Sequence, residues 1–248
     1  MNSELTVMWH RQVKKFFRNK QRIFVSLFQP LLFLVAFGFG FGRSFDSSDG
    51  TSYVQYLIPG IVGMTLLFSS TMSGMSLIWD KKFGFLKETL VAPISRTKLL
   101  FGRCLGGATT SLFQGLIVTF LGYVMGFRIE NWVLFPLIIA AIFIIALLFS
   151  LIGTLIATKF DDMSSFPIIM NIVLMPMMFL SSAFFPVENY PNVIQFVVKI
   201  NPFNYCVNLL RYLMSGFETN MFLLSAVIAG LIFLFGALGT GIFNRIEV

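Results

Sequence analysis

The chain has 248 residues, of which 56% are hydrophobic and 12% are charged, and its mean hydropathy is +0.83. Soluble domains of this size carry about a quarter charged residues, so this composition excludes a soluble globular protein and indicates an integral membrane protein. The net charge is +7, and a catalytic or metal site built on several histidines is excluded because His10 is the only histidine.

Residues 1–22 precede the first apolar run and mix apolar with basic side chains. From Glu4 to Arg22 the pattern is typical of an amphipathic helix that lies along the membrane surface. We expect this N-terminal interfacial helix to anchor the first span or to help hold a cytosolic partner, and a flexible basic tail is the alternative. The apolar run that follows exceeds the about 7–15 residues of a signal peptide, so we expect it to be retained.

Six apolar stretches are long enough to cross ~30 Å of hydrocarbon, which takes about 20 helical residues each. These stretches are residues 23–41, 58–78, 104–125, 132–157, 167–185 and 221–243. The sequence therefore predicts an all-α integral membrane protein with six transmembrane helices in a single domain, residues 1–248. The main polar residues within the spans are Gln29, Gln114 and Asn171.

The distribution of basic residues predicts the orientation, since Lys and Arg in short loops stay on the cytoplasmic side. Fourteen of the eighteen fall in the N-terminal segment, in the loop after the second span, and at Lys159 and Arg245. The four on the other side are Arg43, Arg128, Lys199 and Arg211. Both termini are therefore expected in the cytoplasm. The net charge then reflects topology and attraction to anionic membrane lipid, and it implies no nucleic acid partner.

This orientation also places the two cysteines on opposite sides of the membrane. Cys104 begins the third predicted span, and Cys206 follows the fifth. We therefore expect neither a disulfide nor a metal site between them.

The loop at residues 80–103 is basic, lies between the second and third spans, and keeps apolar residues at helical spacing. We expect a helix over residues 81–92. Its apolar face would consist of Phe83, Leu86, Leu90 and Val91. Its charged rim would consist of Lys82, Lys87 and Glu88. Such a helix can insert its apolar face into the groove of a soluble partner.

The end of this loop contains a helix stop and a helix start. Pro93 is expected to end the first helix, and Ser95 can cap the next helix, which leads into the third span. A helix that only rests on lipid would be equally amphipathic, so periodicity leaves that alternative open.

The segment at residues 186–220 contains two apolar pieces that are too short to span, residues 193–200 and 203–214. Asn201 can cap the helix that begins near Pro202. We expect two short helices that enter the outer leaflet as a re-entrant hairpin, which requires cover by protein or water. Arg211 is expected to anchor the outer end of this hairpin, with its charge extended to water or headgroups.

Catalytic chemistry has no evident site in the sequence. Asp161 and Asp162 are adjacent acids, and a solvated turn or a helix cap is their expected role. No predicted span has an ionisable residue at its centre, which argues against an ion-coupled carrier. No G-x-x-x-x-G-K-[ST] phosphate loop is present, so the chain is not expected to be an enzyme that hydrolyses ATP itself.

Two regions of the chain carry a family resemblance, the second of them in two stretches. The run FGFLKETLVAPISRTKLLFGRCLGG, residues 83–107, resembles the cytoplasmic loop of type-2 ABC transporter permeases. FLSSAFFPVENYP, residues 179–191, and INPFNYCVNLLRYLM, residues 200–214, are similar to the signature of the same family before its last span. The compact chain most resembles the daunorubicin-resistance and nodulation-factor export branch.

The resemblance implies roles for particular residues. The element that couples to an ATPase would contain Phe85, Leu86, Glu88, Leu90, Pro93 and Arg96, with Phe83 on the same expected face. The outer re-entrant signature would contain Pro186, Asn201, Pro202 and Arg211.

The resemblance also implies partners and an activity. It predicts a homodimer of six-span permeases, or a pair of homologous ones, in the plasma membrane of a prokaryote. A separate cytosolic ATPase would bind ATP and Mg and drive export of a drug-like, lipid-linked or polyketide-like molecule. The alternatives are a non-transporting membrane scaffold that recruits cytosolic proteins through its basic loop, and an ion-coupled carrier.

Overall fold

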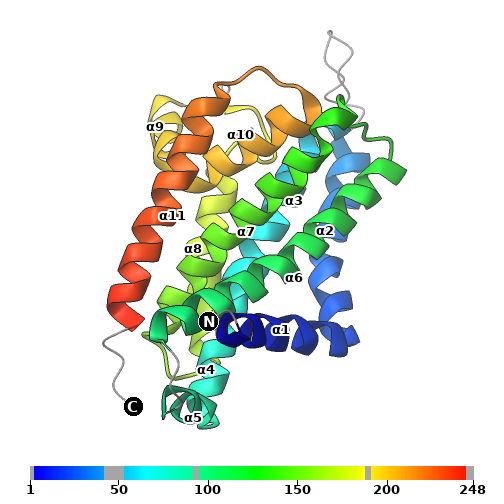
Figure 1. Ribbon diagram of the computed structural model, residues 1–248. Coiled ribbons are helices and arrows are strands. Elements are labelled where there is room, and N and C mark those ends of the chain that lie inside the picture. The colour runs from blue at the N-terminus through cyan, green and yellow to red at the C-terminus, as the bar shows by residue number, and fades with distance from the viewer. Residues whose placement is uncertain (1–2, 42–52, 92–94, 188–190, 244–248) are drawn as a thin grey trace.

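The computed structural model describes residues 3–41, 53–91, 95–187 and 191–243, and within these ranges the secondary structure is helical (Figure 1). The elements are α1 (Ser3–Arg18), α2 (Lys20–Phe41), α3 (Tyr53–Ser73), α4 (Met75–Lys82), α5 (Phe85–Val91), α6 (Arg96–Val124), the 3₁₀ turn η1 (Trp132–Leu134), α7 (Phe135–Ala157), α8 (Ser165–Phe179), α9 (Asn192–Ile200), α10 (Pro202–Ser215) and α11 (Met221–Phe243).

The apolar helices confirm a multi-pass membrane protein. Among the described residues, four segments are long and apolar enough to cross a membrane: Tyr53–Lys82, Arg96–Val124, Trp132–Ala157 and Met221–Phe243. A fifth crossing is possible if α1 and α2, which meet at 72°, are counted as one broken span. With 15 residues, α8 is shorter than the about 20 residues of a straight crossing, so six spans stay a prediction.

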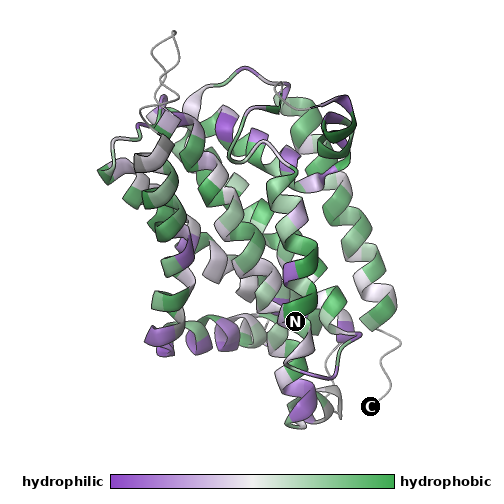
Figure 2. Ribbon diagram, turned by 180° about the vertical axis from the view of Figure 1, so that it is seen from behind, coloured by the Kyte–Doolittle hydropathy of each residue, from purple (hydrophilic) through white to green (hydrophobic). Residues whose placement is uncertain are grey.

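The helices form a bundle with one short helix lying across each end (Figure 1). α3, α6 and α7 pack against one another in its interior, and α2 and α11 lie outside them. α1 crosses one end, where α4 and α5 also project, and α10 crosses the other. We call these the α5 end and the α10 end. Figure 2 shows hydrophilic residues along α1 and around α5, whereas the long helices between the two ends are mostly hydrophobic.

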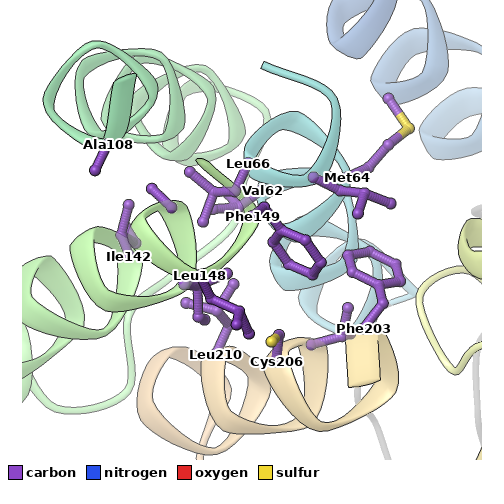
Figure 3. Close-up of a cluster of buried hydrophobic side chains, with 14 of the residues drawn as sticks. Val62, Met64, Leu66, Ala108, Ile142, Leu148, Phe149, Phe203, Cys206 and Leu210 are labelled. Carbon is purple, nitrogen blue, oxygen red and sulfur yellow. The ribbon is translucent and has the colours of Figure 1, made fainter. Parts of the chain in front are cut away.

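The core joins α3, α7 and α10. Figure 3 shows Val62 and Leu66 of α3, Phe149 of α7, and Phe203 and Leu210 of α10 side by side, and each is at most 1% exposed. Phe149 and Phe203 meet edge to face with their ring centroids 6.1 Å apart. Cys104 and Cys206 are free thiols buried in separate helices, α6 and α10.

The α3–α4 segment and α7 approach so closely that glycine is required on both sides. A Cβ at Gly74 would overlap the backbone at Gly153, and a Cβ at Gly153 would overlap the backbone at Thr71. Such small residues let the backbones of membrane helices pack directly against each other.

The predicted fifth span, residues 167–185, is wrong at its end. α8 stops at Phe179, and residues 181–185 are a non-helical stretch that folds back against α3. Gly60 of α3 makes room for this stretch, because a Cβ there would overlap the Ala183 carbonyl. Tyr53 and Tyr56 donate hydrogen bonds from their hydroxyls to the carbonyls of Phe184 and Ser182, at 3.1 and 2.8 Å. Side chains therefore replace the helical hydrogen bonds that this stretch lacks.

Gly153→Ala is expected to destabilise the fold because the added methyl group forces α3 and α7 apart. Overpacking of this kind costs about 1–3 kcal/mol, and thermal unfolding in detergent should show a lower Tm. Gly230→Ala in α11 is the matched control, since no atom lies within 4 Å of a Cβ at that position. Equal Tm values for the two variants would contradict the close contact.

Candidate functional site

α1 is fixed along the first turns of α6. A Cβ at Gly102 would lie 2.9 Å from the Cβ of Met8, and one at Gly106 would overlap Gln12. Trp9 Nε1 donates to Thr109 Oγ1 at 2.9 Å. These two glycines of α6 therefore make contacts within the chain, and their lack of a side chain lets α1 approach closely.

A buried carboxylate connects α1, α4 and α6. Asp80 of α4 is 3% exposed, and Arg11 of α1 donates to both of its oxygens, at 3.0 and 3.1 Å. Nη2 of Arg103 in α6 lies 2.6 Å from Oδ2, as an ion pair rather than a well-aligned hydrogen bond. Arg103 is itself 3% exposed. We call Arg11, Asp80 and Arg103 the charge triad.

Sequence reasoning missed the charge triad because it treated Asp80 as the first residue of the basic loop between the second and third spans. The available signal was an acidic residue directly at the end of an apolar run, with basic residues in both flanking segments. A carboxylate removed from water requires partners of opposite charge, since its desolvation costs several kcal/mol. Both partners are distant in sequence.

The predicted single helix over residues 81–92 is wrong. α4 ends at Lys82, and Gly84 adopts a left-handed conformation with φ of +79°, after which α5 begins at Phe85. Glycine takes this conformation without the steric cost that other residues incur, so it reverses the chain here. The side chains of Lys87, Leu90 and Val91, and the whole of Pro93, lie outside the described residues.

The break places the predicted apolar face on two different surfaces. Leu86 is 3% exposed and packs into the bundle core, whereas Phe83 and Phe85 are 59% and 51% exposed. Phe83 stacks on Trp79, which is 41% exposed, with 5.4 Å between the ring centroids. We call Trp79, Phe83 and Phe85 the aromatic patch.

The aromatic patch is connected to the charge triad. The guanidinium of Arg11 lies over the ring of Phe85, with Cζ 5.3 Å from the ring centroid. A cation at this distance is attracted to the electron-rich face of the ring. Arg11 therefore contacts both the exposed ring and the buried carboxylate.

The remaining residues predicted for this element are polar. Lys82 and Glu88 are exposed beside the patch, which agrees with a charged rim. Arg96 is half-buried in the first turn of α6. Ser95 occupies the cap position of α6 as predicted, but its side chain makes no capping hydrogen bond, so that part of the prediction is wrong.

The loop between α7 and α8 lies at the same end. The Asp162 carboxylate accepts hydrogen bonds from the hydroxyls and N–H groups of Ser164 and Ser165, which hold the pKa of that carboxyl well below its usual range. Asp162 therefore forms a hydrogen-bonded turn before α8, whose cap position is Ser164, and this agrees with the expected turn rather than with a helix cap. Lys81 of α4 lies 3.3 Å from Asp161 and donates to the Thr158 carbonyl, so α4 is also connected to this loop.

At the α10 end, the predicted helices over residues 193–200 and 203–214 correspond to α9 and α10. Asn201 caps α10 as predicted, accepting from Phe203 N–H at 3.0 Å, and Pro202 occupies its first turn. The Asn201 amide also donates to the carbonyls of Met177 and Leu180, at 2.7 and 2.6 Å. One side chain therefore ends α8 and begins α10. Pro186 follows the non-helical stretch, outside the helices.

Arg211 is not extended to water, which corrects the prediction. It is 5% exposed, and Nη2 donates to the Ser182 carbonyl at 2.6 Å while Nη1 donates to Asn208 Oδ1 at 3.1 Å. Its Cζ lies 3.7 Å from the centroid of the Tyr56 ring. Carbonyl oxygens and an aromatic face surround the charge, so it binds the non-helical stretch to α3 and α10.

Comparison with known proteins gives a consistent result. Residues 3–215 match the model of the family described as ABC-2 type transporter. The chain is 29% identical over 218 residues to the inner membrane transport permease YadH of Escherichia coli (strain K12), covering 84% of this chain and 81% of that protein. It is 29% identical over 235 residues to the putative transport permease ycf38 of Cyanophora paradoxa, covering 90% and 79%. It is also 29% identical over 192 residues to nodulation protein J of Azorhizobium caulinodans, covering 75% and 73%.

Asp80→Asn is expected to release α1 from the bundle, because two guanidinium groups then face each other without a carboxylate. Removing one member of a buried charge group costs about 3–5 kcal/mol. A lower Tm in detergent and faster proteolysis near the α1–α2 bend would show this. Asp161→Asn is the control, since the Asp161 side chain is 92% exposed and such pairs contribute about 0–1 kcal/mol. Equal effects would contradict the role of the charge triad.

Arg211→Lys keeps the positive charge but loses the planar fork that bonds Ser182 and Asn208 together. Hydrogen bonds to charged groups contribute about 1.5–3 kcal/mol each, so the Tm should fall clearly. Arg128→Lys is the comparison, because Arg128 also lies over a tyrosine ring but is exposed. If both variants lost the same small amount, the buried fork would have no special role.

Proposed function

The chain belongs to the ABC-2 type transporter family, and from this premise we propose that it is the permease subunit of an exporter for hydrophobic or amphipathic molecules. Energy would come from a separate cytosolic ATPase that binds ATP and Mg. This division of labour is supported by the absence of a phosphate loop from the chain and by relatives named as transport permeases.

The observation that carries the proposal is the aromatic patch at the α5 end. Trp79, Phe83 and Phe85 are large apolar side chains, each at least 41% exposed, and Lys82 and Glu88 flank them. A cluster of exposed aromatic side chains with a polar rim is typical of a surface that binds another protein. We propose that the ATPase receives this patch in an apolar groove.

The charge triad would transmit movement of the docked ATPase from the aromatic patch to the helices of the bundle. α5 is short and is connected to the bundle through the buried Leu86 and through Arg11, which bonds Asp80 and lies over Phe85. A force applied to the aromatic patch therefore acts on α4, α1 and α6 together. This is the property that a coupling helix requires.

The orientation follows from the same assignment. The α5 end and both termini would face the cytoplasm, in agreement with the fourteen basic residues expected there. The α10 end would face outward, with α9 and α10 as a re-entrant hairpin beside the membrane lipid. A second copy of the chain would complete the transporter as a homodimer, the arrangement implied by the resemblance.

Phe83→Asp is expected to abolish ATPase copurification and transport, while membrane insertion stays normal. A charge forced into an apolar groove costs several kcal/mol, and even ~3 kcal/mol weakens binding by more than a hundredfold. Glu88→Gln on the same element is the control and should cause only a milder, salt-sensitive defect. If Phe83→Asp retains its ATPase and full transport, the patch only rests on lipid, and a scaffold or a carrier becomes the better assignment.

A further inference from the structure

The described residues line a partly open cavity of about 270 Å³ between α2, α3, α6 and α8, to which Phe16 of α1 also contributes. Gln29 of α2, Gln114 of α6 and Asn171 of α8 all line it. These three residues are the main polar interruptions of the predicted spans. The fold therefore brings polar side chains from three predicted spans together at one place. Polar side chains within a membrane cost free energy unless they find hydrogen-bond partners.

The side-chain oxygen of Gln114 accepts no hydrogen bond from any described residue. It is 2% exposed, and its amide nitrogen donates to Ser26 Oγ at 2.6 Å. Ser26 donates its one hydrogen to the Ile23 carbonyl at 2.8 Å, so it can only accept from Gln114. This fixes the orientation of the amide and leaves Gln114 Oε1 buried without a hydrogen-bond partner among the described residues.

The neighbouring hydroxyls, like Gln114 Oε1, can act only as hydrogen-bond acceptors toward the cavity. Thr65 donates to the Ile61 carbonyl at 2.8 Å, Thr110 to the Gly107 carbonyl at 2.9 Å, and Ser73 to the Ser70 carbonyl at 2.6 Å. Each hydroxyl has one hydrogen, so what remains for the cavity is its oxygen lone pairs. The wall formed by Gln114 and these hydroxyls therefore offers hydrogen-bond acceptors.

The rest of the lining is uncharged: it contains the amides of Gln29 and Asn171 and the hydroxyl of Ser69, and its other residues are apolar. Met64, Phe68 and Met72 of α3 form an adaptable apolar side, and the lining contains no acidic or basic residue. Because the lining has no charged residue, neither an anion nor a cation would find a counter-charge there. The volume is just below the roughly 300–1,000 Å³ of sites that enclose a drug-sized ligand, so it suits part of a larger molecule.

We propose that this cavity binds the polar part of an amphipathic molecule that carries neutral hydrogen-bond donors, such as hydroxyl or amide N–H groups. Gln114 Oε1 accepts one of these donors, and the apolar part of the molecule contacts the methionines and Phe68. The proposal rests on the proposed function and deepens it by naming the class of substrate.

The test is equilibrium binding to the purified permease in lipid nanodiscs, without any ATPase. The probe is radiolabelled octyl β-glucoside, whose head carries several hydroxyls. Octyldimethylamine N-oxide is the comparison, because it has the same tail and a neutral head without a hydrogen-bond donor. We expect saturable binding of the glucoside and much weaker binding of the N-oxide, because the N-oxide has no donor for Gln114 Oε1 and only the lining amides could bond its oxygen.

Gln114→Met keeps the side-chain volume and removes the acceptor, and it should weaken glucoside binding about tenfold, the scale of one buried hydrogen bond. Gln195→Met in α9, outside the cavity lining, is the matched control and should bind as the wild type. If Gln114→Met does not fold, the isosteric Thr65→Val gives the same test with a smaller loss.

The proposal is overturned if the glucoside does not bind saturably, if both probes bind equally, or if the cavity variants bind as tightly as the control. Because the assay contains no ATPase, these results are independent of the copurification experiment. Loss of docking with glucoside binding intact would reject the proposed function of the aromatic patch and leave the cavity assignment standing.

Discussion

The arrangement at the α5 end depends on one buried carboxylate, Asp80. Its position between Arg11 and Arg103 determines where α1 lies and how α4 leaves the bundle. The buried charges of Asp80 and Arg103 are costly, and they are tolerated because they pair with each other while Arg11 also pairs with Asp80. The positive charge in excess is met by the ring of Phe85, which lies under Arg11 at the surface. The same group of charges therefore joins α1, α4 and α6 to one another and to the aromatic patch.

At the α10 end, polar side chains bond the backbone of a non-helical stretch instead of a buried carboxylate. The non-helical stretch at residues 181–185 has backbone groups that lipid cannot bond. Tyr53, Tyr56 and Arg211 donate to its carbonyls, and the Asn201 amide donates to the last carbonyls of α8. Two of these donors belong to α3, and the other two belong to α10 and its cap residue. The end of α8 thus has a defined path only when α3 and α10 are packed beside it.

Local signals in the sequence predicted local structure well. The amphipathic N-terminal helix and both short helices near Pro202 were predictable, because caps, prolines and periodicity act over a few residues. The break at Gly84 was missed because periodicity continues across it, although glycine after Phe83 was a warning. The burial of Asp80 and Arg211 depends on partners up to 155 residues away in sequence. The convergence of Gln29, Gln114 and Asn171 on one cavity is likewise a property of the tertiary fold.

α1 has a second role that follows from its length and stiffness. Arg11, which bonds Asp80, and Phe16, which lines the cavity, are five residues apart on the same rigid helix, or about 7.5 Å along its axis. α1 meets α2 at a 72° bend, where Asn19 separates the two helices. Helix α1 therefore connects the charge triad to the cavity lining. A displacement of α4 that moved Arg11 would also move Phe16, and so change the shape of a cavity that α4 itself does not line.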